Sequence, residues 1–564
     1  MSQAPRRTLR FAVVLDQASL NRWQAACLKA LSQSGHAQIE AVIVIGRVEP
    51  NWATFLRLIR YPLWQLTFAR LRRTGCLSPV GERLPDGVPV IAWQSRQAAL
   101  TQELHQARLP ALSDLELDFL LDLSGRFSAM NIYNRARYGV WTFACGDGGS
   151  FADGTAGFHS FARGDAVVEV TLRGSTESGK SQVLRRGFWS IIPSSPTGTI
   201  GAIYFGCADF PALACADIRV DCDVARTKMD FVEADHELPG NWTVAKAFIC
   251  GTRWHILDRL RVALSHTQWN IGLFQANNVD PFASSKATPV LWFPEQSAPR
   301  FSADPFLVRQ KGSVTVLGEM ADEYDMRGVI GAWQIDGGEV VSLGPVIEEP
   351  DVHLSYPYVF RWRGELYCMP ERAEVGGPIV YRAVEFPFRW ERAAHLLPGV
   401  RAIDPTVFEY GGYWWLACTD CASGSESRLL LWHASEPLGR WYPHAHNPVR
   451  IDPRGARGAG APFIHNDSLI RPAQDCSMTY GRRVVFNRII SLTPEQYEEE
   501  VVGDLIPDAC GDYPEGLHTI SIDGELIVID GLRIAFDPLA WLRKIRRHRL
   551  EAVRRKRAEY DRPA

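Results

Sequence analysis

The 564-residue sequence lacks the uninterrupted run of about 20 apolar residues that a transmembrane helix needs. Its first residues also lack the apolar core of a secretion signal, so we expect a cytoplasmic protein. The pair Cys418 and Cys421 has no second Cys-x-x-Cys partner, so the 12 cysteines predict no metal site. No Gly-x-Gly-x-x-Gly follows the first predicted strand, so a dinucleotide site is not supported and we predict no cofactor.

The chain also lacks an excess of charge of either sign. With 61 Lys and Arg against 64 Asp and Glu, its net charge is −3, and no global basic field indicates a nucleic-acid partner. The exception is the basic C-terminal segment 536–564, which we expect to be a helix. Within 541–557, apolar residues such as Trp541 and Ile545 stand among basic ones. Two interpretations stay open, a weak contact with a membrane surface and a solvated terminal helix.

The N-terminal part alternates apolar strands with helical patterns. Strands are predicted at 8–16, 38–46, 88–92 and 117–123, and helices at 18–33, 51–74 and 95–106. This alternation predicts an α/β domain with a doubly wound parallel sheet.

One stretch of this part carries a family pattern. Residues 138–147, Tyr-Gly-Val-Trp-Thr-Phe-Ala-Cys-Gly-Asp, precede Gly157-Phe158 and the segments 168–172 and 176–179. Residues 8–190 resemble the N-terminal domain of the folate-dependent methionyl-tRNA and sugar formyltransferases, which implies a formyltransferase-like α/β domain over 1–195. Where that family uses an Asn, a His and a later Asp, this chain has Thr142, Ala144 and Glu177. Alanine cannot act as a general base, so the resemblance implies the fold more than the activity. Reduced folate is expected only if formyl transfer is retained.

The second half is built on a repeat. Its copies open at Asp304-Pro305, Tyr356-Pro357 and Asp404-Pro405, and more loosely at 461–463 and 518–520, at intervals of 52, 48, 57 and 57 residues. Each opening leads to a strand, a turn, and a second strand that ends at or beside an acid; the turns fall at Gly312, Gly364, Gly412, Asp467 and Gly524. Five such copies predict an all-β five-bladed propeller over 266–535, joined to the first domain by a connecting segment, 196–265. We expect the strand 267–274 to close the ring by pairing with the last blade.

The propeller segment resembles a known group on specific residues. These are Ala303-Asp304-Pro305-Phe306, 353–357 with Pro370-Glu371, Ile403-Asp404-Pro405-Thr406, 471–475 and His518-Thr519. They are similar to the N-terminal domain of plant glucosamine inositolphosphorylceramide transferases and to five-bladed glycoside hydrolases such as arabinanases. This resemblance implies a carbohydrate-active protein whose partner is a glycan or an activated sugar.

In a propeller the first residues of the innermost strands gather at one mouth of the channel. We therefore place Asp304, Tyr356, Asp404, Ala461 and His518 there. The resemblance to hydrolases implies that Asp304 is a base, that Asp404 tunes the acid, and that Glu371 is the proton donor. The residues predicted to bind substrate are His353, Tyr356, Arg457, Arg471, Gln474, Asp475 and His518, with Arg457 a candidate for an anionic group. The remaining repeat acids, Glu319, Asp420 and Asp530, are expected to have structural roles.

We therefore expect a protein that binds or modifies a glycan or an activated amino sugar in surface polysaccharide or glycolipid synthesis, through the propeller mouth. Three alternatives stay open: a sugar N-formyltransferase, a non-catalytic glycan-binding scaffold, and a glycosidase. A glycosidase needs two carboxylates about 5 Å apart for retention, or about 6.5–9.5 Å apart for inversion. Whether the chain is an enzyme is left undecided by the sequence.

Overall fold

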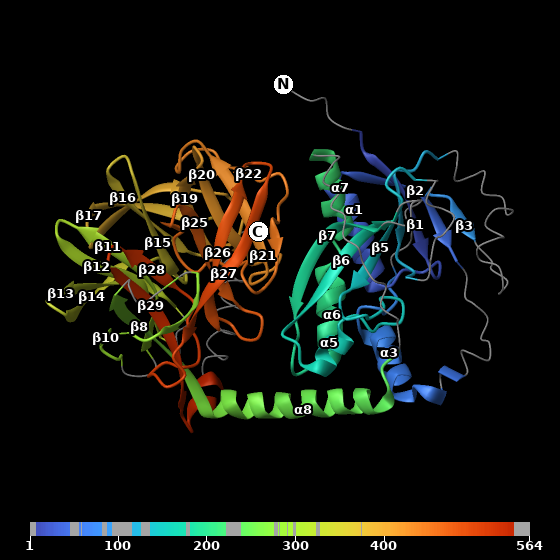
Figure 1. Cartoon of the computed structure of the whole chain (residues 1–564), viewed down its shortest axis with the longest axis horizontal. Helices are drawn as coiled ribbons and strands as arrows, with labels where there is room; N and C mark the ends of the chain where they lie inside the picture. The colour runs from blue at the N-terminus through green and yellow to red at the C-terminus, as the bar shows by residue number, and fades with distance from the viewer. Residues whose placement is uncertain are drawn as a thin grey trace, which may run out of the picture. The chain divides into compact units, whose positions relative to one another are not determined.

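The computed structural model divides into two compact units, Met1–His255 and Ile256–Ala564 (Figure 1). It describes residues 7–45, 56–57, 59–81, 87–92, 115–125, 136–175, 181–220, 238–275, 280, 282–289, 291–296, 300–322, 327–373 and 375–545. The predicted helix 95–106, Glu177 and most of 541–557 lie outside these residues. The boundary between the units falls inside the predicted connecting segment.

The N-terminal unit is built on one seven-stranded sheet with the order β3-β2-β1-β4-β5-β6-β7. Its strands are β1 (Leu9–Leu15), β2 (Ala37–Val44), β3 (Val90–Ala92), β4 (Phe119–Asp122), β5 (Val140–Cys145), β6 (Val167–Ser175) and β7 (Ser181–Ser190). The first five strands pair in parallel, whereas β6 and β7 are antiparallel. Strands β1 and β4 are almost fully buried, as expected for the centre of a parallel sheet. The predicted parallel sheet is confirmed, and its formyltransferase-like identity stays a prediction.

Helices complete this unit and lead out of it. They are α1 (Arg22–Ser34), α3 (Pro62–Thr74), α5 (Phe158–Arg163), α6 (Pro196–Gly206), α7 (Phe210–Val220) and α8 (Asn241–Leu264). Helix α1 begins with a capping box between Asn21 and Gln24, which satisfies two backbone donors at its start. Among the described residues, the stretch Pro196–Val220 is long and apolar enough, by length and composition, to cross a membrane. Of the apolar 18-residue window in this stretch, 61% is buried, and buried core helices pass the same test.

The C-terminal unit is a five-bladed β-propeller, as predicted. Its five sheets contain four or five strands each. Blade 1 consists of β11 (Arg300–Gln310), β12 (Ser313–Asp322), β13 (Val329–Asp336) and β14 (Glu339–Ile347), and blade 2 of β15 (Ser355–Trp362), β16 (Glu365–Glu371), β17 (Ile379–Glu385) and β18 (Arg389–His395). Blade 3 consists of β19 (Ala402–Tyr410), β20 (Tyr413–Asp420), β21 (Arg428–Ala434), β22 (Tyr442–Pro443) and β23 (Arg450–Ile451). Blade 4 consists of β24 (Phe463–His465), β25 (Ser468–Asp475), β26 (Arg483–Leu492), β27 (Tyr497–Pro507) and β9 (Ser284–Ala287).

Blade 5 closes the ring because it takes strands from both ends of the propeller sequence. Its order is β28 (Ile520–Asp523), β29 (Leu526–Phe536), β8 (Ser265–Gln275) and β10 (Leu291–Trp292). Strand β8 pairs with β29 along its whole length, from Ser265 opposite Phe536 to Gln275 opposite Leu526. The expected closure by the strand at 267–274 is therefore confirmed.

The first hairpin of each blade turns where the repeat predicts. Gly312, Gly364, Gly412, Asp467 and Gly524 all have positive φ. In blades 1 to 4 the preceding residue also has positive φ, the backbone of the type I′ turn whose twist matches that of paired strands.

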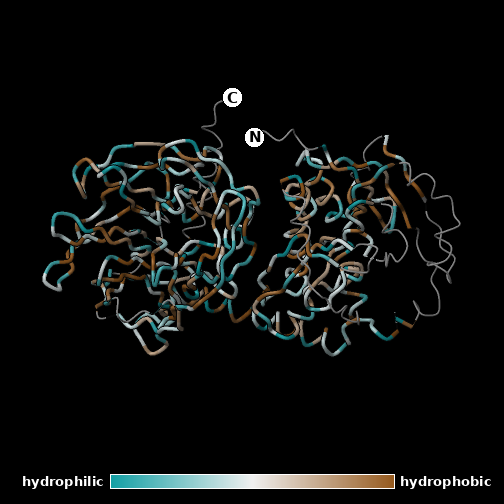
Figure 2. The backbone as a smooth tube through the Cα atoms, turned by 45° about the horizontal axis from the view of Figure 1, so that its top comes forward, coloured by the Kyte–Doolittle hydropathy of each residue, from teal (hydrophilic) through white to brown (hydrophobic). Residues whose placement is uncertain are grey.

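Buried apolar residues between neighbouring sheets hold the blades together. Tyr358 of blade 2 packs in one cluster with Val407 and Leu416 of blade 3, and Val308 of blade 1 packs with Leu354 and Cys368 of blade 2. Figure 2 shows hydrophobic and hydrophilic stretches alternating along the backbone of both units. The faces of the blades are thus buried against their neighbours, and polar groups can lie at the ends of the strands.

Candidate functional site

Three blades of the propeller open with the same strained backbone. Asp304, Tyr356 and Asp404 have φ values of 51°, 43° and 47°, although none is a glycine and each precedes a proline. The pairing register shifts at the same place, between Ala303 and Phe306 in blade 1 and at the matching positions of blades 2 and 3. Bulges with strained residues re-aim side chains, and they persist only where the surrounding structure holds them. The repeat therefore points equivalent side chains inward from different blades.

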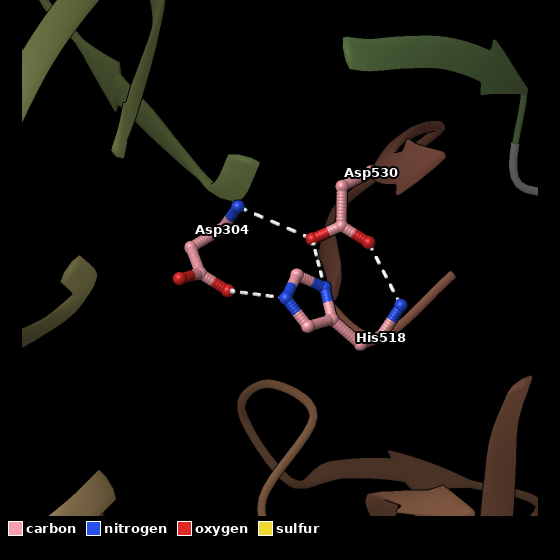
Figure 3. Close-up of side chains that lie close together, drawn as sticks. All are labelled: Asp304, His518 and Asp530. Atoms are coloured by element: carbon pink, nitrogen blue, oxygen red, sulfur yellow. Dashed lines mark hydrogen bonds and ion pairs between the residues drawn. The ribbon is translucent and has the colours of Figure 1, made fainter. Parts of the chain in front are cut away.

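Asp304 lies beside His518 and Asp530 of blade 5 (Figure 3). The imidazole of His518 stands between the two carboxylates, with Nδ1 2.5 Å from Asp530 Oδ2 and Nε2 3.7 Å from Asp304 Oδ1. Thr519 donates its hydroxyl to Asp304 Oδ1 at 2.7 Å. All four side chains are buried. These residues form one buried group of ion pairs and hydrogen bonds.

Burial and neighbouring charges shift the proton affinities of this group. Burial raises the pKa of Asp304 to about 6, against the attraction of His518, and the carboxylates of Asp530 and Asp404 add to the rise. Burial lowers the pKa of His518, but the carboxylates of Asp530 and Asp304 outweigh it and raise that pKa to about 9. At neutral pH, His518 is therefore a buried imidazolium ion, and Asp304 is poised near its titration range.

Asp404 anchors a second cluster at the same end of the channel. Its Oδ2 accepts hydrogen bonds from Arg457 Nε at 2.6 Å and from Gln474 Nε2 at 2.8 Å. Both Asp404 and Gln474 are buried. The carboxylate of Asp404 is also near enough to Asp304 to raise its pKa, so the two clusters belong to one electrostatic network.

Carboxylates also connect neighbouring blades through backbone amides. Asp304 N–H donates to Asp530 Oδ2 at 3.2 Å, Tyr356 N–H donates to Asp304 Oδ2 at 3.2 Å, and Asp404 N–H donates to Glu371 Oε2 at 2.9 Å. In each case an acid of one blade holds the strained opening residue of the next. Burial raises the pKa of Glu371 well above its usual range, and Asp404 adds to this while Arg457 opposes it.

A glycine-rich loop packs tightly against these carboxylates. A Cβ atom on Gly458 would lie 3.1 Å from the Asp404 carbonyl oxygen and 3.4 Å from the hydroxyl of Tyr356. Gly460 has φ of 134° and donates its N–H to that same hydroxyl at 2.8 Å. The absence of side chains lets the loop bring Arg457 onto Asp404.

Two aromatic rings that the sequence interpretation did not assign to the site border it. Trp269 of β8 stacks on His518 with ring centres 4.2 Å apart and an interplanar angle of 18°. Tyr480 packs edge-on against His518, and the Arg457 guanidinium lies 4.8 Å from its ring centre. Tyr480 is 42% exposed, so part of this residue reaches solvent beside the buried carboxylates. The predicted closure of the ring brings Trp269 here, although the sequence pattern did not show which side chains of that strand face the site.

The other predicted site residues have partners of their own. Arg471 is paired with the buried Glu499, at 2.9 Å and 2.8 Å, and Asp475 pairs with Arg483 at 2.8 Å. His353 accepts from Gly328 N–H through Nδ1 and lies 3.4 Å from Glu319 through Nε2. Arg471 and Asp475, which were predicted to bind a ligand, thus use their charged groups in ion pairs within blade 4.

The group Asp304, His518 and Asp530 is also the set of described residues whose ligand atoms, all within 4.8 Å of one another, could hold a metal ion. A histidine must be neutral to bind a metal. Because the two carboxylates raise the pKa of His518 to about 9, the ion pair is the favoured state of these residues at neutral pH.

The N-terminal unit has a hollow at the carboxyl ends of its central strands. A cavity of about 70 Å³ is lined by residues that follow β1 and β4, among them Asp16, Gln17 and Ser124, and by Trp23 and Arg72. The chain leaves the sheet in opposite directions at β1 and β4, and ligands of doubly wound sheets bind at such a point. Thr142 and Ala144, which stand at the formyltransferase positions, lie on β5.

Residues 269–509 match a family model described as the N-terminal part of glucosamine inositolphosphorylceramide transferase 1. The chain is 38% identical over 206 residues to the protein of that name from Arabidopsis thaliana, which covers 35% of this chain and 27% of that protein. It is 39% identical over 215 residues to the protein of that name from Oryza sativa subsp. japonica, covering 37% and 29%. The chain thus spans less than a third of the length of these relatives.

Solved structures with similarity to this chain include a family 117 glycoside hydrolase from Zobellia galactanivorans, with 15% identity and a TM-score of 0.29 over 48% of this chain and 91% of that one. A GH43_1 enzyme from Xanthomonas citri has 14% identity and a TM-score of 0.31 over 43% and 88%. The alpha-L-arabinanase of Cellvibrio cellulosa has 13% identity and a TM-score of 0.27 over 35% and 76%.

Proposed function

We propose that the propeller binds a sugar unit of a glycan or an activated amino sugar at its channel mouth, in glycolipid or surface polysaccharide synthesis. The observation that carries this proposal is the position of Asp304 and Asp404. They come from blades 1 and 3, share one strained backbone position and belong to one buried polar network. The relatives of this segment are named for glucosamine and inositolphosphorylceramide, which supports a sugar or its glycolipid acceptor as the ligand.

The chemistry of the mouth suits a sugar. Carboxylates accept hydrogen bonds from hydroxyl groups, and the guanidinium of Arg457, which Gln474 helps to position through Asp404, supplies donors. The exposed part of Tyr480 offers an aromatic surface against which a sugar ring can pack. Arg457 also carries the positive charge that a phosphate on an activated sugar or on a glycolipid head group would contact.

A chemical step at this site has one specific observation in its favour. A carboxyl group with a raised pKa is a suitable general acid, and the pKa of Glu371 is raised well above its usual range by burial and by Asp404. We assign Glu371 as proton donor to the leaving oxygen when a glycosidic or sugar–phosphate bond breaks. A water molecule or an acceptor hydroxyl then forms the new bond to the anomeric carbon and gives its proton to Asp304 or Asp404, the second carboxylate. A mouth that binds sugars without turnover is the scaffold alternative.

Binding is tested by calorimetry on the full chain with glucosamine, N-acetylglucosamine, their UDP derivatives and inositol phosphate. We expect one of these ligands to bind. We expect the Asp404→Asn substitution to weaken its binding about tenfold or more, because the side chain that holds Arg457 and Gln474 in place loses its negative charge. The matched control is Asp467→Asn in the exposed turn between β24 and β25, which should bind like the parent.

Binding by none of these ligands, or equal binding by the Asp404→Asn protein, would overturn the sugar proposal. With a bound ligand in hand, Glu371→Gln separates the roles: lost turnover with retained binding supports the chemical step, whereas no turnover in the parent supports the scaffold. Formyl transfer by the N-terminal unit stays a prediction of the resemblance, and failure to bind a reduced folate would remove it.

A further inference from the structure

Helix α8 carries a row of exposed apolar residues, interrupted by Lys246 and Arg253, on one side. Val244, Ala247 and Gly251 are its buried residues and share one side of the helix. The opposite side carries Ile249, Ile256, Leu257, Leu260 and Leu264, with exposed fractions of 62%, 53%, 53%, 52% and 39%. Spacings of seven and four residues keep these side chains on one stripe. From Ile256 on, these residues belong to the C-terminal unit, and exposed apolar residues in such a row indicate a contact surface of that unit.

A second exposed apolar segment adjoins the end of this helix. Asp537 N–H donates to the carbonyl of Leu264 at 2.7 Å, and Lys544 Nζ donates to the carbonyl of Val262 at 2.5 Å. Between them, Phe536, Leu539, Trp541 and Leu542 are 76%, 55%, 45% and 46% exposed. We call Leu257, Leu260, Leu264, Phe536, Trp541 and Leu542 the apolar patch; all six belong to the C-terminal unit.

Basic residues neighbour the apolar patch in the sequence. Arg259 and Arg261 lie on α8, and Arg543 and Lys544 follow Trp541, against the acids Asp258 and Asp537. Arg543 already pairs with Asp537 at 2.7 Å. The sequence that follows, 546–557, adds seven Arg or Lys residues and one Glu. Apolar side chains within a basic border are the pattern of a surface that lies on anionic lipid.

We propose that the apolar patch docks the protein on an anionic membrane surface. Charge decides between the occupants, because a second copy of the chain would bring two basic borders together, whereas anionic head groups neutralise them. Aromatic and aliphatic residues such as Trp541 and Leu260 enter the head-group boundary, and the arginines stay at its polar level. The inference stands on the patch alone and does not need the sugar site.

The test is sedimentation of the full chain with phosphatidylcholine vesicles, with and without about 30% phosphatidylglycerol. We expect binding to the anionic vesicles that falls as salt is raised. The double variant Leu257→Glu with Leu260→Glu should bind at least tenfold more weakly. The matched control is Ile490→Glu with Val501→Glu, whose parent residues on β26 and β27 are 53% and 55% exposed and should not affect binding.

A second pair, Trp541→Ser with Leu542→Ser, gives an independent answer should the helix variant fail to fold, which circular dichroism will show. The proposal is overturned if the parent does not sediment with anionic vesicles, or if both patch variants bind like the parent. It is also overturned if the parent is a dimer without vesicles and the patch variants are monomers, because a second copy then covers the patch. Loss of sugar binding with retained vesicle binding leaves the inference intact.

Discussion

At the scale of single residues, the most unusual feature is the buried histidine between two carboxylates. His518 is 3% exposed, and the negative charges of Asp530 and Asp304 keep its ring protonated at neutral pH. The positive charge of His518 therefore contributes to the stability of the fold. Its removal would leave two buried carboxylates without their cation.

This charge predicts a dependence of stability on pH. The folded pKa of His518 is about 9 and its ordinary value is 6.5, so its contribution is complete below about pH 6.5 and is lost as pH rises to 9. Asp304, with a pKa of about 6, is mostly ionised at pH 6.5 and fully so by pH 9, so its own titration adds little to the change in this window. We expect the free energy of unfolding of the propeller to fall by about 3 kcal/mol from pH 6.5 to 9. Denaturant titrations measure the slope, and a His518→Gln protein with the same slope would contradict the assignment.

Some site residues could be predicted and others could not. Asp304, Asp404 and His518 were identified because each opens a copy of the repeat, and the structure brings them into one network. Trp269 reaches that network through the predicted pairing of β8 with β29, but the pattern did not show which side chains of that strand face the site. Asp530, expected from the repeat to have a structural role, accepts the backbone N–H of His518 only 12 residues away. Arg471 was assigned to a ligand, but its partner Glu499 lies 28 residues away on β27, also out of reach of a repeat-based argument.

At the scale of elements, neighbouring blades are connected by acidic side chains that accept hydrogen bonds from backbone amides. The hairpins were predictable from glycine and aspartate at the turns, since only a few residue types tolerate positive φ. The positive φ of Asp304, Tyr356 and Asp404 was not predictable, because an Asp-Pro pair usually indicates an extended strand entry. The strain is stable there because the neighbouring blade supplies an acceptor to the amide.

Glu371→Ala tests this joint between blades 2 and 3. The buried N–H of Asp404 would lose its acceptor, and we expect the propeller to be destabilised by about 1–3 kcal/mol. Glu371→Gln keeps an acceptor oxygen and should be close to the parent. The control is Glu365→Ala, an exposed residue at the start of the same strand β16. Equal unfolding midpoints for Glu371→Ala and Glu365→Ala would show that the amide contact does not hold the blades.

At the scale of the whole molecule, ring closure joins the two ends of the propeller. A fragment 256–545 contains all five blades, whereas a fragment 276–545 lacks β8 and leaves β29 with an unpaired edge. We expect the first to unfold in one cooperative transition and the second to aggregate or to lose cooperativity. Calorimetry and size-exclusion chromatography measure both properties, and a monomeric, cooperative 276–545 fragment would mean that closure is not required.

The same closure of the ring means that β8 must wait for its pairing partner during synthesis. Strand β8 leaves the ribosome among the first propeller segments, but its partner β29 begins about 250 residues later. At about 5–20 residues per second, that delay is roughly 13–50 seconds. The nascent chain therefore has an unpaired β8 edge during most of the translation of the propeller. We expect the yield of folded protein to depend more on chaperones that shield strand edges than on the stability of the closed ring.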